Sequence, residues 1–503
     1  MLRAARFSLD ANKATWGALA LLVGLAVSVL PLPLAVAAVG AAVIGMTLLV
    51  EPVLALALML GIAPLKTLIQ TESPLALPVD AGQLLFALVV GLWLVTRVLY
   101  EDRRTLPRTR IFVPLAIIML GFGPSLFVAR SAGAWVSEMV KWVEMALLVA
   151  VVLELGARGR WRWIAFAAVL SAALQALIGI YEYQGGSGAP HLWVSNYTHF
   201  RAFGTFGQPN PFSAFMGLTV PLALGLAWGY LTQAWAQWQA KRDAYDLWGP
   251  SLAVAALYAG LGVLILGGLV VSLGRGAWLG FGAAAGVMVF FAPRNRWLAV
   301  ALVGAGIVLG VSLWLTGLLP TAIQARIDNA VDEFTGFGDV RGLPISDENF
   351  AIIERLAHWQ AALNMAQAHP WLGVGLGSYE AAYNDYRVPS WPRPLGHAHN
   401  DYLNLLAETG IVGLTTYLFG WVLIVFWTIR ALHQNDPVLR GLVLGLLGVW
   451  THLAVHSFVD KLYVNNLFLH IGVVLGLLAV AWTQRSPLSE GVRIVIKVHS
   501  GER

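Results

Sequence analysis

The sequence predicts an all-α membrane protein: a polytopic transmembrane helical bundle of 12–14 spans with a large periplasmic loop containing short amphipathic helices. Hydrophobic residues make up 58% of the chain and charged residues only 12%, compared with about 25% charged residues in ordinary soluble domains. A soluble protein could not bury that much apolar surface, so we expect the excess to face lipid. Inside lipid, each backbone polar group must be satisfied within its own segment, which favours helices.

The apolar residues gather into segments close to the length of about 20 residues that a crossing helix needs. By our count there are fourteen of them: 14–30, 34–50, 53–68, 84–99, 111–128, 135–153, 163–181, 212–231, 252–272, 277–291, 297–318, 411–429, 442–458 and 462–482. The segment 53–68 carries Pro64 and Lys66 near its end, which is also compatible with a re-entrant helix.

The distribution of positive charge predicts the orientation of the spans. With the N-terminus in the cytoplasm, most lysines and arginines fall in the inner segments, as positive-inside topology requires. The formal net charge of +5 therefore reflects topology, and we expect no nucleic-acid partner. The chain is expected to be multi-pass with both termini cytoplasmic, and to carry its chemistry on the non-cytoplasmic face. Cysteine is absent, which excludes disulfides, thiolate metal ligands and a cysteine nucleophile.

These spans and the loops between them suggest five regions. They are the N-terminal transmembrane helices (1–155), the central transmembrane helices (156–318) with a periplasmic loop (184–208), the large periplasmic loop (319–410), the C-terminal transmembrane helices (411–484) and a cytoplasmic tail (485–503).

The large loop contains one helical pattern. Five residues recur at helical spacing on one face, and Pro370 follows them: Ile352, Leu356, Trp359, Leu363 and Ala366. This pattern predicts an amphipathic helix that lies on the bundle or in the membrane interface and ends before Pro370. The glycine-rich stretch HPWLGVGLGSYE that comes next follows no strand, so a dinucleotide-binding turn is not expected.

Three charged residues fall within one predicted span, at Glu138, Lys141 and Glu144. Their spacing of three residues places them near one face of a helix. We interpret them as an internal ion-pair set that fixes helix packing, in preference to a proton relay.

The first polar motif is RAFGTFGQPNPFSAF, which follows the shorter periplasmic loop. Asn210 is a suitable N-cap and Pro211 fits the first helical position, so a span is expected to begin here. The free N–H groups of that helix would point outward, with Arg201 a few residues upstream. A guanidinium beside a helix N-terminus favours an anion, phosphate above all, although Arg201 could also simply pair with a loop carboxylate.

The second polar motif is SLGRGAWLG, where two spans meet at the outer face with almost no loop. Gly274 and Gly276 allow a tight turn around Arg275. A guanidinium at the membrane boundary needs a carboxylate, water or a bound anion as its partner, unless it extends to the interface.

The third polar motif is PLGHAHNDYLNLLAETGIVG, at the end of the large loop. Asn400 is expected to cap the following helix, and His397 and His399 precede it on the same membrane face as both arginines. The two-residue spacing resembles a metal pair, but no third ligand is nearby in sequence, so we assign no metal and no cofactor. A histidine here suits a general base or a contact to substrate, since its unperturbed pKa is about 6.5.

Together the three motifs resemble the O-antigen ligase and O-antigen polymerase superfamily of bacterial inner-membrane glycosyltransferases. The resemblance covers roughly residues 163–482. It includes R-x-x-G-T-F-x-x-P-N from Arg201, S-x-x-R-G-A-W from Ser272, H-N-x-x-L from His399 and E-x-G-x-x-G from Glu408.

The resemblance implies a glycosyltransferase of lipopolysaccharide biosynthesis whose donor is a glycan linked to undecaprenyl diphosphate. Arg201 and Arg275 would hold the diphosphate, with Asn210, His397 and Asn400 as further substrate contacts, and catalysis would rest on His399 with both arginines. The expected acceptor is a lipid A-core sugar or another glycan, and membrane lipid surrounds the protein. The transfer would be a metal-independent displacement that inverts the anomeric centre. The alternatives are a polysaccharide polymerase, a protein O-oligosaccharyltransferase and, in a different class, a flippase or exporter of lipid-linked sugars.

Overall fold

The computed structural model describes residues 51–72, 80–99, 107–186, 193–194, 199–241, 243–293, 295–319, 324, 340–341 and 350–485. The chain divides into two compact units. The first comprises Met1–Met59 and Leu85–Thr105, and the second comprises Leu60–Leu84 and Leu106–Arg503. Two predicted spans, 14–30 and 34–50, lie outside the described residues.

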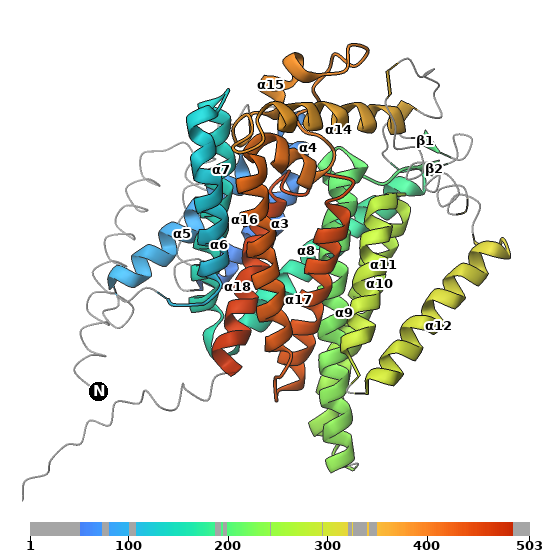
Figure 1. Cartoon of the computed structure of the whole chain (residues 1–503). Coiled ribbons are helices and arrows are strands. Elements are labelled where there is room, and N and C mark those ends of the chain that lie inside the picture. Colours follow the sequence, from blue (N-terminus) through green and yellow to red (C-terminus); the bar gives the residue numbers. More distant parts are fainter. Residues whose placement is uncertain are drawn as a thin grey trace, which may run out of the picture. The chain divides into compact units, whose positions relative to one another are not determined.

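The described part of the chain is helical apart from one pair of two-residue strands (Figure 1). Near the N-terminus lie α3 (Pro52–Ile62), η1 (Ala63–Leu65), α4 (Lys66–Glu72) and α5 (Ala81–Leu99). The next elements are α6 (Phe112–Phe122), η3 (Gly123–Val128), α7 (Ala132–Leu155), η4 (Ala157–Gly159), α8 (Trp161–Tyr183), β1 (Trp193–Val194), β2 (His199–Phe200) and η6 (Gly204–Phe206). The remainder are α9 (Pro209–Ala240), α10 (Tyr245–Val271), α11 (Arg275–Phe291), α12 (Arg296–Leu315), α14 (Phe350–Ala368), α15 (Tyr379–Tyr386), α16 (Asp401–Ala431), α17 (Pro437–His456) and α18 (Leu467–Arg485).

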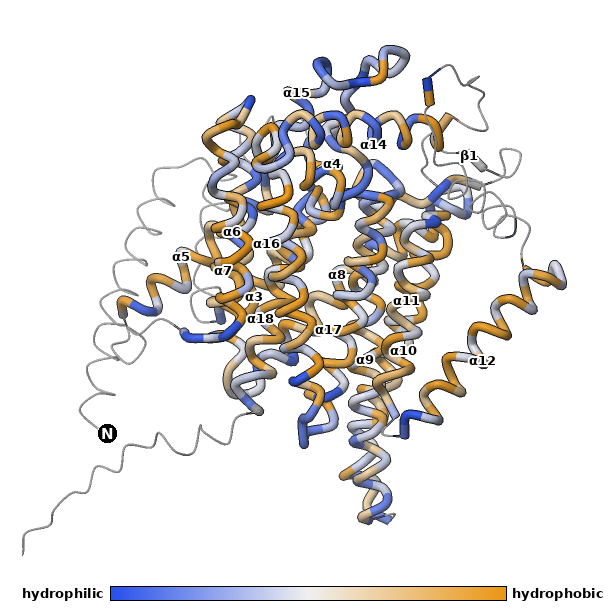
Figure 2. Tube along the Cα trace, viewed as in Figure 1, coloured by the Kyte–Doolittle hydropathy of each residue, from blue (hydrophilic) through white to orange (hydrophobic). Residues whose placement is uncertain are grey.

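Nine helices within the described residues are long and apolar enough to cross a membrane, and α11 and the α6–η3 segment are shorter apolar helices. Figure 2 shows apolar residues along most of their length. This confirms the prediction of an all-α, multi-pass membrane protein. The segment with Pro64 is divided, since the 3-10 turn η1 separates α3 from α4.

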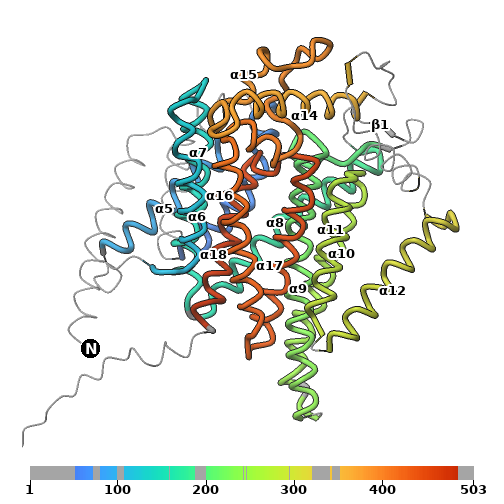
Figure 3. Tube along the Cα trace, in the orientation of Figure 1, coloured from blue at the N-terminus to red at the C-terminus, as the bar shows by residue number. Residues whose placement is uncertain are grey.

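The helices of the second unit run alternately up and down, so their ends form two layers (Figure 3). One layer, which we call the α14 end, lies beneath α14 (Figure 1). At this end α8 finishes at Tyr183, α9 begins at Pro209, α11 begins at Arg275 and α16 begins at Asp401. The three polar motifs therefore lie at one end of the bundle, as the predicted topology requires.

Side chains cap several of these helices and so fix where they begin. Ser131 accepts a hydrogen bond from the backbone of Ala134 at the start of α7. Asp436 does the same for α17, with Pro437 at the first helical position. Asn400 caps α16 by accepting from the Leu403 N–H over 3.0 Å, which confirms its predicted role.

The start of α9 differs from the prediction. The helix begins at Pro209, with Gln208 in extended conformation before it, so Asn210 and Pro211 already lie within the first turn. The prediction that Asn210 is the N-cap is wrong because Pro209, which has no N–H to satisfy, takes the first helical position instead. The Asn210 carbonyl accepts a hydrogen bond from the Ser213 hydroxyl.

Helix α14 lies over the bundle and ends before Pro370, as predicted, but its buried stripe is shifted. Ile353, Ala357, Ala361 and Met365 are buried, whereas Leu356 on the predicted face is only half-buried. The shift arises because alanines on the buried face permit close approach to α15 and α16. A hydrophobic pattern based on large side chains gives alanine little weight, so it does not predict this face.

Helices α9 and α17 pack with their backbones in close contact through glycines. A Cβ atom added to Gly441 would collide with the carbonyl oxygen of Gly225, and one added to Gly225 would lie 2.5 Å from Gly445. Small residues at four-residue spacing are a common means of helix association in membranes, because they allow backbones to approach.

We expect the substitution Gly441→Ala to destabilise the protein by about 1–3 kcal/mol, since the added methyl group overpacks this interface. Thermal unfolding of the purified protein in detergent measures the effect. Gly304→Ala in α12 is the matched control, because a Cβ there meets nothing within 4 Å and alanine favours helix. Equal unfolding midpoints for the two variants would contradict the tight α9–α17 contact.

Candidate active site

The histidine motif lies between α15 and α16 and is held by backbone hydrogen bonds. The Ala398 N–H donates to the Asn404 side chain over 3.1 Å, and the His399 N–H donates to Nδ1 of His397 over 3.1 Å. His399 has φ +51°, a left-handed conformation that is uncommon for residues other than glycine. The motif is thus fixed in a specific turn at the N-terminus of α16.

His399 faces an aspartate that the sequence analysis did not single out. Nδ1 of His399 lies 3.6 Å from Oδ1 of Asp460, and the two side chains are only 19% and 9% exposed. Asp460 belongs to the residues 457–466 that connect α17 to α18, which we call the 457–466 turn. The separation exceeds hydrogen-bond length, so in this state the two groups are in electrostatic contact.

The charges around His399 follow from burial and from the neighbouring groups. Burial lowers the pKa of His397 to about 3, assisted by repulsion from His399, so His397 is neutral at physiological pH. Burial alone would raise the pKa of Asp460, but the neighbouring imidazoles of His399 and His397 outweigh burial and lower that pKa. Asp460 is therefore an ionised carboxylate beside two imidazoles.

The two arginine motifs are tied to each other. Nε of Arg201 donates to the carbonyl of Ser272 over 3.2 Å, and the Ala202 N–H donates to the carbonyl of Val271 over 3.1 Å. Arg275 is the first residue of α11, three positions after Ser272, and both arginines are half-buried. A loop at residue 201 and a helix start at residue 275 thus form one basic region.

A buried glutamate positions the Arg201 segment. Oε2 of Glu182, in the last turn of α8, accepts from the N–H groups of Phe203 and Gly204 over 2.9 and 2.8 Å. Thr205 is held in turn by the side chain of Gln175. Sequence reasoning missed Glu182, because a single carboxylate at the end of an apolar helix resembles any boundary residue.

The arginine region and the histidine motif meet at the end of α17. A Cβ atom on Gly276, next to Arg275, would collide with Val459 and would lie 3.0 Å from Cδ2 of His456. Val459 is adjacent to Asp460, which faces His399. The Arg275 and histidine motifs therefore meet at one short turn, and the Arg201 motif, about 200 residues before His399 in sequence, is bonded to the Arg275 motif.

Two predicted contacts have other roles in the structure. Asn210 lies inside the first turn of α9, and Asn400 uses its side chain to cap α16. Neither observation assigns a contact with substrate.

Asp460 also supplies the third ligand that was lacking for a metal pair. Donor atoms of His397, His399 and Asp460 all lie within 4.8 Å of one another, and imidazole with carboxylate is a common zinc-binding set. The positive charge of Lys461 acts on His397 and opposes a cation here. The donor set is compatible with a divalent ion, and chelation of the purified protein tests this.

The glycine-rich stretch after Pro370 is a structural insert. Helix α16 breaks at Gly410, which has φ +63°, and the N–H groups of Val374 and Gly375 donate to the carbonyls of Ala407 and Glu408 over 2.9 and 2.8 Å. A Cβ atom on Gly373 would collide with the Ala407 carbonyl. The glycines are thus needed for backbone contact with α16.

A family model and two curated relatives are similar to parts of this chain. Residues 260–418 match the family model described as O-antigen ligase. The exopolysaccharide production protein ExoQ of Rhizobium meliloti is 25% identical over 223 residues, which cover 40% of this chain and 50% of the relative. An uncharacterized protein of Haemophilus influenzae is 21% identical over 189 residues, covering 36% and 45%. The matches therefore span about half the length of these curated relatives.

By its fold and candidate site, the chain is a multi-pass helical membrane protein with basic and imidazole groups at one end of its bundle. The family match and the ExoQ relative then confirm the resemblance seen in the motifs. Over residues 260–418 the chain is similar to the O-antigen ligase family, and part of the chain is also similar to ExoQ.

Proposed function

We propose that this protein transfers a glycan from an undecaprenyl-diphosphate carrier to an acceptor hydroxyl, most specifically as an O-antigen ligase acting on a lipid A-core sugar. The observation that carries the proposal is that Gly276, next to Arg275, and His399 both lie against the 457–466 turn, while Arg201 is hydrogen-bonded to Ser272 just before α11. We place the enzyme in the bacterial inner membrane, with cytoplasmic termini, the α14 end in the periplasm and the five regions delimited above.

In the proposed reaction, the acceptor oxygen attacks the anomeric carbon while the bond from that carbon to the diphosphate oxygen breaks. His399 accepts the hydroxyl proton, and the ionised Asp460 stabilises the resulting imidazolium. The bond electrons pass to the departing diphosphate, whose charge Arg201 and Arg275 stabilise together with the N-terminal end of α11. Direct displacement inverts the anomeric centre, and His397, Asn210 and Asn400 are proposed as substrate contacts.

A second candidate is a polysaccharide polymerase, which would join one lipid-linked repeat unit to another. The ExoQ relative favours it, since that protein's name refers to exopolysaccharide production. Incubating the purified protein with a lipid-diphosphate glycan and either lipid A-core or a second lipid-linked unit distinguishes the two by product. Glycan found on an added protein would indicate an O-oligosaccharyltransferase, and movement of the donor across vesicles without bond formation would indicate a flippase.

We expect glycan transfer to proceed at an unchanged rate after treatment with EDTA, because the proposed charge stabilisation comes from guanidinium groups. The measurement compares initial rates before chelation, after chelation and after adding back Zn²⁺ or Mg²⁺. A rate that falls with EDTA and recovers with a metal would instead assign a catalytic ion to His397, His399 and Asp460.

A further inference from the structure

Asp401, the first residue of α16, forms hydrogen bonds to the turn that contains Asp460. Oδ2 of Asp401 accepts from the Ser457 hydroxyl over 3.0 Å and from the Leu462 N–H over 3.1 Å. The Asp401 N–H donates to the Ser457 carbonyl over 2.8 Å. Because Asp401 lies two residues after His399, these bonds connect the two residues that face each other in the candidate active site.

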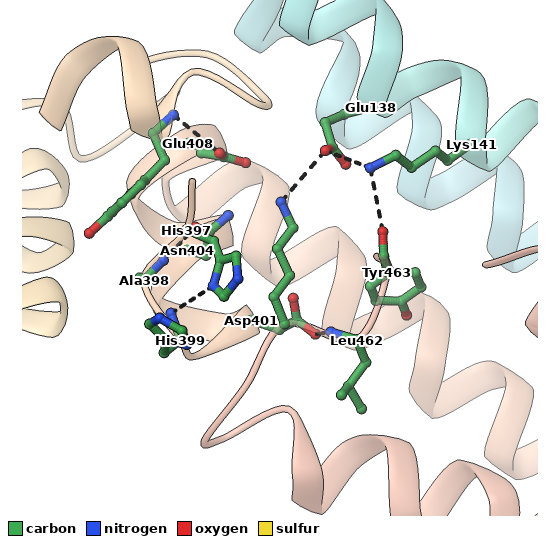
Figure 4. Close-up of polar contacts among 12 residues, drawn as sticks. Glu138, Lys141, His397, Ala398, His399, Asp401, Asn404, Glu408, Leu462 and Tyr463 are labelled. Atoms are coloured by element: carbon green, nitrogen blue, oxygen red, sulfur yellow. Dashed lines mark hydrogen bonds and ion pairs between the residues drawn. The ribbon is translucent and has the colours of Figure 1, made fainter. Parts of the chain in front are cut away.

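Lys461 connects the same turn to helix α7 through an ion pair. Its ammonium lies 3.6 Å from Oε1 of Glu138 on α7, and the Lys461 side chain is only 10% exposed. Glu138 also pairs with Lys141 over 2.7 Å, and Lys141 approaches the carbonyl of Tyr463 (Figure 4). A cavity of about 20 Å³, enough for a water molecule, is lined by Glu138, Trp142, Leu376, Asp401, Asn404, Leu405, Glu408, Lys461 and Tyr463.

The charge of Lys461 persists in this buried position. Burial by itself lowers the pKa of Lys461, but attraction by Glu138, Glu408 and Asp401 outweighs burial and raises that pKa above its ordinary value. The ammonium cannot leave this buried position without breaking its ion pair with Glu138. This strongly restricts the position of the backbone at residue 461, and with it the position of Asp460.

We propose that Lys461 is a positioning residue for the transfer reaction: with Asp401 it fixes the 457–466 turn so that Asp460 faces His399. Consecutive side chains of one turn point into two charge clusters, Lys461 toward Glu138 and Asp460 toward His399. A displacement of Lys461 should therefore also displace Asp460 relative to His399. The catalytic part of this inference rests on the proposed function, whereas the geometric part does not.

The first test is kinetic and uses the full-length protein. Lys461→Met is expected to lower kcat about ten-fold or more while KM for the lipid-linked donor changes less than about two-fold, since small misplacements of catalytic groups are costly. Adding Glu408→Gln should recover part of the thermal stability but not kcat, because Lys461 supplies the main attraction on that buried carboxylate. Recovery of stability and kcat together would indicate a purely structural role and overturn the proposal.

The second test does not depend on enzymatic activity. Diethyl pyrocarbonate modifies accessible imidazoles, and mass spectrometry of peptides from the folded protein reports the rate at His399. Lys461→Met should increase that rate several-fold. The matched control is Arg162→Met, which removes a cation paired with Asp436 over 3.9 Å at the end of the bundle opposite the 457–466 turn.

The two tests separate the possible failures. If the wild-type protein transfers no glycan, the proposed function fails, and the labelling rate at His399 still decides whether Lys461 fixes the turn. If transfer occurs but Lys461→Met leaves both kcat and His399 labelling unchanged in folded protein, the positioning role is overturned.

Discussion

Replacing His399 with alanine is expected to lower the rate of glycan transfer by about two to four orders of magnitude, the range typical of a lost general base. His397 accepts a hydrogen bond from the His399 N–H and Asp460 faces the His399 ring, so we assign the proton transfer to His399. The measurement is kcat for transfer by purified protein, with donor binding determined separately. Binding should be nearly unchanged, because the diphosphate is assigned to the arginines.

Two variants sharpen this prediction. Asp460→Asn keeps the shape of the side chain but removes the charge that stabilises the His399 imidazolium, so we expect a smaller loss of kcat, of about ten- to hundred-fold. His433→Ala is the matched control, since His433 is exposed in the connection between α16 and α17 at the other end of the bundle. Transfer at the wild-type rate by the His399 variant would remove the general-base assignment.

Much of this site could be predicted because the motif residues have recognisable local roles next to helix ends. The Arg201 and Arg275 motifs stand next to apolar runs of clear length, so the nearby helix ends follow from hydropathy. Asn400 was predictable as a cap because capping is a local property of the chain. The internal pair Glu138–Lys141 was predictable for the same reason, although Glu144 instead accepts from the side chain of Gln83 over 3.1 Å.

Asp460, Lys461 and Glu182 could not be assigned in this way, since their roles depend on which distant segments pack beside them. Asp460 and Lys461 stand between two apolar runs without any spacing that suggests chemistry. Their only signal was that two charges interrupt a long apolar region, which is costly unless partners exist. Asn210 failed for a related reason, because a general cap preference was applied where Pro209 and the Glu182-bound loop decide the start of α9.

Exchanging Arg275 for lysine is expected to reduce glycan transfer about ten- to hundred-fold, although the charge is kept. A guanidinium can bond two phosphate oxygens at once through its planar fork, and an ammonium cannot. Losing one charge-assisted hydrogen bond costs about 1.5–3 kcal/mol, which corresponds to that fold-change. Arg201→Lys should act in the same direction and would also lose the Nε bond that joins its loop to Ser272.

If Arg275 binds the diphosphate, its replacement should change lipid affinity selectively. Wild-type protein should bind undecaprenyl diphosphate more tightly than undecaprenyl monophosphate, and Arg275→Ala should remove most of that difference. Arg296→Lys is the matched control, because Arg296 is exposed at the start of α12, where its guanidinium stacks on Phe290 and Phe291. If Arg275→Ala bound both lipids as the wild type does, the basic region beside the 457–466 turn would not be the diphosphate site. The convergence of the three motifs would then require another anion or a purely structural explanation.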